Sequence, residues 1–258
     1  MKTKNCLTAV LVASLLLPTF ARADFKARGS DSTLHVLKAL AAAFAADTGK
    51  TITLEGGGSG AGVKGLESGD VSLAFLSREL SAAEKSAGLV GSVYAADGVA
   101  VIVHPTNAAA NFTLAELKDI FTGKTEAWAD GKPIILFNRN ADSGTREVFH
   151  DRVLGKDAFS AKAMVKHDGV LLGSLAKLPG AIAYTSLGEV DEAKVRVVTV
   201  NGITPSAATL RDGTYPIGRK PTLATKGAAT GDEKAFLDFV LGPKGQAVVA
   251  QSGLVPVK

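Results

Sequence analysis

The chain has 258 residues, of which 46% are hydrophobic, and its formal net charge is +4 at pH 7. This hydrophobic fraction, combined with dispersed charge, excludes an intrinsically disordered chain. A single cysteine excludes a disulfide scaffold, so the fold must depend on its core. The length suits one large domain or two modest ones.

The first 23 residues have the pattern of a cleaved export signal. Two lysines precede the apolar run 7–17, which is too short to span a bilayer, and Ala21-Arg22-Ala23 is a small-x-small cleavage site. Cys6 lies near the start of the apolar run, where it cannot serve as a lipid anchor after cleavage. We therefore expect residues 1–23 to be removed and a soluble periplasmic protein, not lipid-anchored, to remain.

Cleavage also changes the charge balance. Removing residues 1–23 from the 258 leaves 235 residues, and it takes away three basic side chains and no acidic one, so the formal charge falls from +4 to +1. A nucleic-acid partner is not predicted at this balance.

Beyond the signal, predicted strands alternate with predicted helices. Apolar or β-branched runs predict strands or crossing segments at 25–29, 51–54, 71–76, 99–103, 133–136, 181–184, 195–200 and 215–223. Caps and apolar stripes predict helices at 33–48, 63–66, 114–122, 143–154, 171–178, 233–241 and 245–252, and the capping-box spacing of Ser81 and Glu84 predicts the start of another helix. This alternation predicts an α/β fold of mainly parallel sheets with helices on both faces.

Three strand-to-helix turns have the same chemistry. They are Gly29–Thr33, Gly58–Gly62 and Asp142–Thr145, and each combines small residues, hydroxyls and the backbone N–H groups of a helix start. Arg139 and Arg78 follow predicted strands nearby in the sequence, and a guanidinium suits an oxyanion. Because ligands of such sheets bind at the carboxyl ends of strands, we expect the three turns to converge on one small anion.

Several motifs, in this order and spacing, carry a resemblance to a known family. The chain resembles the periplasmic phosphate-binding (PstS-like) proteins of phosphate ABC importers. The matching segments are Gly29–Thr33, Gly58–Lys64, Ser77–Leu80, Asp97–Val103, Leu117–Gly123 with Trp128, Arg139 with Ser143–Arg146, Pro179–Tyr184, Asp212–Pro216 and Gly245–Pro256.

The resemblance implies a two-lobed type II periplasmic-binding-protein fold with the ligand in the cleft between the lobes. Lobe 1 would be discontinuous, formed by residues 24–102 and 217–258, and lobe 2 would be formed by 103–216. It also implies phosphate as the ligand, the membrane permease of an ABC importer as the partner, and neither catalysis nor a cofactor or metal. We expect a monomer. The implied ligand contacts are Ser32, Thr33, the amide of Leu34, Ser59, Ser77, Arg139, Ser143, Gly144 and Thr145, with Arg78 as a further candidate.

One departure from the family concerns selectivity. Where well-studied members have a carboxylate that accepts the proton of hydrogen phosphate and repels sulfate, this chain has Ser77. A serine hydroxyl can also accept a hydrogen bond, and Asp31 or Asp142 are alternative acceptors. Phosphate and related tetrahedral oxyanions therefore both stay open as ligands.

The same residues also leave other functions to consider, among them dinucleotide binding, hydrolysis, metal binding, signalling and adhesion. The turn Gly56–Ala61 between two predicted strands imitates a dinucleotide-binding fingerprint, although its last glycine is an alanine. Ser59 has glycine neighbours, but Ala61 stands where a nucleophile elbow requires glycine. The four histidines show no metal-ligand spacing. A signalling or adhesive protein on the same fold is a further alternative, because fold does not fix function.

Overall fold

The computed structural model describes residues 25–257. The predicted signal at 1–23, with Cys6, lies outside these residues. Within 25–257, no helix combines the length and the apolar character needed to cross a membrane.

Lobe 1, as we use the name, is built on a five-stranded sheet with the order β2-β1-β3-β13-β4. Its first three strands are mutually parallel, whereas β13 runs antiparallel to both β3 and β4. The bounds are β1 Phe25–Gly29, β2 Ile52–Glu55, β3 Leu73–Leu76, β4 Leu89–Val93 and β13 Thr222–Lys226.

Helices cover both faces of this sheet because its buried side chains alternate. Leu73 and Phe75 pack with α1, α8 and α9, while Ala74 and Leu76 pack with α2 on the opposite face. Successive side chains of a strand point to opposite faces, which explains the two separate cores. The helix bounds are α1 Leu34–Thr48, α2 Ser59–Ser68, α8 Gly231–Leu241 and α9 Pro243–Gln251.

Lobe 2 is built on a second sheet with the path β10-β5-β9-β7-β8. Strands β9, β7 and β8 are parallel, and β5 runs antiparallel to its neighbours β9 and β10. The bounds are β5 Ala95–Val103, β7 Ile135–Asn138, β8 Met164–Val165, β9 Ala181–Ser186 and β10 Arg196–Val197.

The same alternation gives lobe 2 two cores. Val101 and Tyr184 face a core that includes residues of α4 and α5, whereas Ala100 and Ala183 face α6. Tyr184 stacks on Phe149, with ring centroids 4.0 Å apart. The helices are α4 Leu114–Thr122, α5 Gly144–Phe149, which continues as a π-helical turn His150–Leu154, and α6 Asp168–Leu175.

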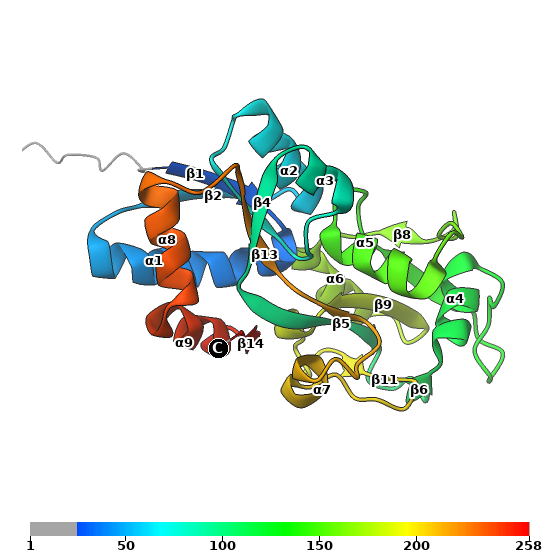
Figure 1. The fold of residues 1–258 in the computed structure, drawn as a ribbon. Helices are drawn as coiled ribbons and strands as arrows, with labels where there is room; N and C mark the ends of the chain where they lie inside the picture. Colours follow the sequence, from blue (N-terminus) through cyan, green and yellow to red (C-terminus); the bar gives the residue numbers. More distant parts are fainter. Residues whose placement is uncertain (1–24, 258) are drawn as a thin grey trace, which may run out of the picture.

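Two segments connect the lobes. The chain leaves lobe 1 through β4 and enters lobe 2 along β5, and it returns through β12 (Gly218–Arg219), which pairs with β5 before β13 begins. Figure 1 shows the blue and the orange-to-red parts of the chain together on one side, the green and yellow parts on the other, and β5 and β13 passing between. The prediction of a two-lobed α/β fold is confirmed, while the residue boundaries of the lobes stay a prediction.

The structure differs from the sequence prediction in some elements. The sheets are mixed and not mainly parallel, because each adds antiparallel strands to three parallel ones. The predicted strand 195–200 is divided, since β10 pairs with β5 while β11 (Thr199–Val200) pairs with β6 (Asn111–Phe112). Elements that the sequence analysis missed are β4, β6, β8, β14 (Val255–Pro256) and α7 (Ala207–Arg211).

Candidate functional site

The first turns of α1 and α2 lack the capping box that three other helices have. In α3 (Ala82–Ser86), α4 and α7, a capping box satisfies the terminal N–H groups. Neither α1 nor α2 has a side-chain N-cap hydrogen bond, and neither has an acidic residue in its first turn. No side chain therefore caps these two helix starts, although Leu34 N donates to the carbonyl oxygen of Asp31 and Gly60 N to that of Asp142. The positive ends of the two helix dipoles favour an anion.

The three predicted turns meet at the contact between the lobes. Thr145 of α5 donates its hydroxyl to Ser32 Oγ at 3.1 Å. A Cβ placed on Gly144 would lie 2.3 Å from Ser59 Oγ and 2.6 Å from Ser77 Oγ, so the backbone of Gly144 lies directly against both serines. The three turns therefore meet with the lobes closed on each other, while their convergence on an anion stays a prediction.

The second turn also contacts the loop before α5 through its backbone. Gly60 N donates to the carbonyl oxygen of Asp142 at 3.2 Å. Gly58, with φ of 100°, leaves no room for a side chain, because a Cβ there would lie 2.3 Å from the same oxygen. Because the Asp142 backbone lies against Gly58 and Gly60 in this closed arrangement, the structure does not favour a dinucleotide at the Gly56–Ala61 turn.

Seven predicted ligand residues have buried side chains or backbones in this region. Arg139, which follows β7, is 2% exposed, and its backbone N–H donates to Asn138 Oδ1 at 2.8 Å. Tyr184 also donates to Asn138 Oδ1, which fixes the end of β7. The others are Ser32, Thr33, Ser59, Ser77, Ser143 and Thr145, each at most 4% exposed. Ser143 caps α5 by accepting from Arg146 N at 3.2 Å, and Leu34 is the first residue of α1.

Arg78 lies at the same contact but is held by carboxylates. Its guanidinium donates to both oxygens of Glu84 at 2.8 Å and, through Nε, to Glu147 of α5. Burial favours the neutral form of Arg78, but these two carboxylates outweigh it and raise the pKa of Arg78. Arg78 therefore joins the lobes through an ion-pair network, and a direct contact with an anion stays a prediction for this residue.

Sequence reasoning missed a buried ion pair at the base of this region. Arg219 Nε and Nη2 donate to Asp97 Oδ2 at 2.8 and 2.6 Å, and both side chains are 1% exposed. The two residues are adjacent across the β12–β5 pairing. Arg219 also donates to Thr145 Oγ1 at 2.6 Å. The sequence did contain one signal of this pair, which is Asp97 within the apolar strand β5. A fully buried aspartate requires a partner of opposite charge.

The two alternative proton acceptors have other partners. Asp31 Oδ1 accepts from Gly57 N at 3.0 Å, and Asp142 Oδ1 accepts from Lys64 Nζ at 3.1 Å. Both interactions bring lobe 1 groups to these carboxylates, and the second one crosses between the lobes. Arg146 lies 4.7 Å from the ring centroid of Phe159, which gives it a packing role within lobe 2.

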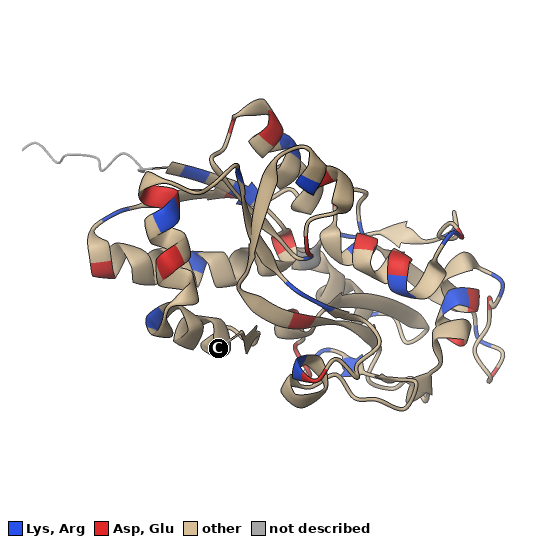
Figure 2. Ribbon diagram, in the orientation of Figure 1, with Lys and Arg blue, Asp and Glu red and all other residues tan. Residues whose placement is uncertain are grey.

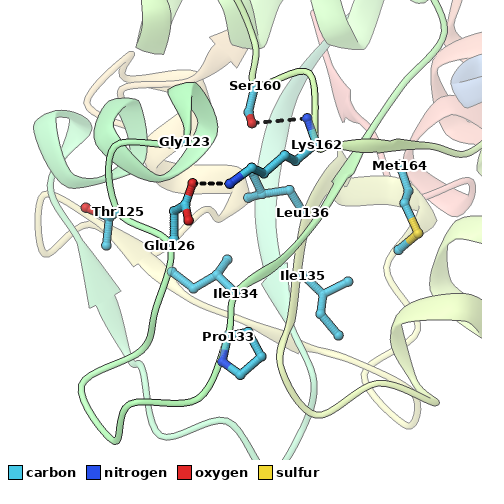
Figure 3. A pocket seen from close by; sticks show the side chains of 10 residues that line it. All are labelled: Gly123, Thr125, Glu126, Pro133, Ile134, Ile135, Leu136, Ser160, Lys162 and Met164. Carbon is cyan, nitrogen blue, oxygen red and sulfur yellow. Dashed lines mark hydrogen bonds and ion pairs between the residues drawn. The ribbon is translucent and has the colours of Figure 1, made fainter.

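Two hollows on the described residues differ in position, because one lies away from the three turns and the other borders the turn Gly29–Thr33 at Asp31. One of about 310 Å³ on lobe 2 is bordered by Ile134, Ile135 and Met164, with Lys162 donating to Ser160 and pairing with Glu126 across it (Figure 3). An open hollow of about 650 Å³ lies at the outer end of the lobe contact, beside Leu34, Gly57 and Asn140. Among residues 25–257, no group of three potential metal-ligating side chains occurs.

Comparison with known proteins agrees with this geometry. A family model described as a PBP superfamily domain matches residues 18–244. The chain is 32% identical over 215 residues to the phosphate-binding protein PstS of Bacillus subtilis, covering 80% of this chain and 71% of that protein. The chain belongs to the PstS-like proteins of the PBP superfamily.

Two further PstS-like proteins extend the comparison. PstS of Borreliella burgdorferi is 27% identical over 226 residues, covering 80% of each chain. A Clostridium perfringens crystal structure with bound phosphate, described as a candidate phosphate ABC transporter substrate-binding protein, is 32% identical with a TM-score of 0.86. That match covers 91% of this chain and 99% of the other. These PstS-like relatives are binding proteins, so the present protein is a binding protein and not an enzyme.

Proposed function

We propose that the protein captures inorganic phosphate between its lobes and delivers it to the membrane permease of an ABC importer. The observation that carries the proposal is the meeting of three helix starts, with the buried Arg139 in the loop before α5. Neither α1 nor α2 has a side-chain cap or an acidic first turn. Such a group of donors suits an anion that has lost its hydration shell.

The two lobes supply different parts of the proposed site. Ser32, Thr33, the amide of Leu34, Ser59 and Ser77 belong to lobe 1, and Arg139, Ser143, Gly144 and Thr145 belong to lobe 2. An anion in contact with both sets stabilises the closed arrangement, and closure is the signal that a permease can recognise. We also propose that the protein works in the periplasm, to which the predicted export signal would direct it, and as a monomer.

Support for phosphate itself comes from the relatives. The Bacillus subtilis and Borreliella burgdorferi proteins are named phosphate-binding proteins, and the Clostridium perfringens structure holds phosphate. Ser77 leaves sulfate and arsenate as competitors, because a serine carries no charge to repel a proton-free anion. Asp31, Asp142 and Asp97 each already accept a hydrogen bond from another group.

Titration calorimetry on refolded, anion-stripped protein tests the proposal. Phosphate, sulfate and arsenate are titrated separately, and we expect saturable one-to-one binding of phosphate at least about tenfold tighter than that of sulfate. Absence of phosphate binding, or tighter binding of sulfate than of phosphate, would refute the proposed function.

A further inference from the structure

The buried pair Asp97–Arg219 lies where the two lobes and the connecting strands meet. Arg219 is on β12 and Asp97 is on β5, so both belong to the segments between the lobes. Arg219 reaches Thr145 Oγ1 of lobe 2 at 2.6 Å and Ser32 Oγ of lobe 1 at 3.4 Å. One guanidinium thus contacts a hydroxyl from each side of the proposed phosphate site.

Asp97 is fully occupied by donors and holds Arg219 in place. Besides Arg219, Asp97 Oδ2 accepts from Ser186 Oγ at 2.6 Å, and Oδ1 accepts from Gly98 N at 2.7 Å. The carboxylate offsets the charge of Arg219, so the pair adds little net charge to the site. A buried ion pair often adds little net stability to a protein. The N–H groups of Arg219 also donate to Thr145 and Ser32, which indicates a role at the proposed site.

The direction of the hydrogen bonds around Arg219 is fixed by chemistry. A guanidinium has no acceptor, so Thr145 Oγ1 must accept from Arg219 and direct its own proton elsewhere. That proton goes to Ser32 Oγ, 3.1 Å away. Ser32 therefore accepts from both residues, and its own proton is left for Ser30 Oγ at 2.9 Å or for a guest in the site.

We propose that Arg219, held by Asp97, is a positioning residue that acts through Thr145 to leave the hydroxyl proton of Ser32 for bound phosphate. The inference rests on the proposed function. With its oxygen already accepting from Thr145 and Arg219, the Ser32 hydroxyl can only donate, and a hydroxyl fixed in this way binds an anion better than one that is free to rotate. This arrangement also links closure to binding, because Arg219 reaches both hydroxyls only when the lobes are together.

A double-mutant cycle on the full chain tests the role of Arg219 with phosphate as the titrant. The variants are Thr145→Val, the pair Asp97→Asn with Arg219→Gln, which avoids an unpaired buried charge, and the combination of all three. We expect the pair to weaken phosphate binding by at least about tenfold, the range for a lost hydrogen bond to a charged group. Because Arg219 acts through Thr145, the combined loss should fall at least about fivefold short of the product of the separate losses.

A second variant keeps the test decisive if the paired substitution does not fold. Arg219→Lys keeps the charge beside Asp97 but lacks the planar fork that reaches both hydroxyls, so we expect a wild-type melting temperature with weakened phosphate binding. Multiplicative losses in the cycle, or unchanged affinity in Arg219→Lys, would overturn the role of Arg219. Wild-type protein that binds no phosphate would instead refute the proposed function itself.

Discussion

Gly144 lies so close to Ser59 that a methyl group on Gly144 would come within 2.3 Å of Ser59 Oγ. This contact joins the first turn of α5 in lobe 2 to the first turn of α2 in lobe 1. Both helix starts can reach a single small anion only because Gly144 carries no side chain there. The closed arrangement therefore depends on glycine at position 144.

Replacing Gly144 with alanine should impair closure without unfolding the protein. We expect Gly144→Ala to weaken phosphate binding by at least about tenfold, since the lobes must separate to accommodate the methyl group. Calorimetry measures the affinity, and circular dichroism measures the melting temperature. Gly173→Ala in α6 is the matched control, because its added Cβ meets nothing within 4 Å. Equal affinities of the two variants would contradict the closed site.

Arg139 is a buried cation that follows β7 and precedes the first turn of α5. Arg139→Ala should weaken phosphate binding by about 1.5–3 kcal/mol or more, the range for hydrogen bonds to charged groups. Arg211→Ala, at an exposed position of α7, is the control and should bind as wild type does. If the Arg139 variant kept full affinity while folded, Arg139 would have no contact with the anion.

The ion pair between Arg78 of lobe 1 and Glu147 of lobe 2 can form only when the lobes are closed, so it stabilises the closed arrangement. Glu147 is 44% exposed, so the ion pair should be worth about 0.2–1 kcal/mol, and Glu147→Gln should weaken binding about 1.5- to 5-fold. The loss should appear as faster release of phosphate in stopped-flow experiments. Exposed Glu67→Gln serves as the control. If Glu147→Gln slowed the association of phosphate and left its release unchanged, the ion pair would not be stabilising the closed arrangement.

Glu84 makes the stability of lobe 1 sensitive to acid. Burial favours its protonated form, but hydrogen bonds from Arg78 and from Ser81 N outweigh burial and hold the pKa of Glu84 below its usual value. Its contribution to stability is therefore complete above the pKa of an unfolded glutamate and is lost as pH falls through the lowered value.

Urea unfolding of wild type and Glu84→Gln at neutral pH, and then at steps from about pH 5 to about pH 3, measures this contribution. We expect the free energy of unfolding of wild type to exceed that of Glu84→Gln at neutral pH, and the difference to shrink as the solution is acidified. A constant difference over this range would show that Glu84 does not titrate as the ion pair requires.

Position 77 is where a carboxylate would separate phosphate from sulfate in the proposed site. A carboxylate at this position accepts the proton of hydrogen phosphate and repels sulfate, so Ser77→Asp should raise the ratio of phosphate to sulfate affinity by at least about tenfold. Ser77→Ala, which adds no acceptor, should leave the ratio nearly unchanged. Competition calorimetry with both anions measures it, and an unchanged ratio in Ser77→Asp would place Ser77 outside the site.

Local signals predicted much of the fold. The capping boxes at Ser81 and Thr113 form as predicted, and Gly49 and Gly123 end their helices in the left-handed conformation. These motifs act within one turn of backbone, so the sequence contains the whole interaction. By contrast, β4 and β14 depend on pairing with distant strands, and α7 has a threonine in place of the usual acidic residue of the capping box.

The site divides in the same way. The three turns and Arg139 were predicted because glycine, hydroxyls and a helix start occur together in sequence. Asp97 and Arg219 were not, since 122 positions separate them and only the pairing of β12 with β5 brings them together. The ion pair between Arg78 and Glu147 likewise forms only when the lobes are closed, so no local sequence pattern could predict it. Charges of both signs are interspersed on the helices in Figure 2, so surface charge gave no guide to these pairs.

A crystal structure of the phosphate-loaded protein tests the central claim most directly. We predict one tetrahedral anion between the lobes, contacted by Arg139, by the first turns of α1, α2 and α5, and by no carboxylate. The anion bound elsewhere, or Thr33, Ser59 and Ser143 directed away from it, would contradict the account.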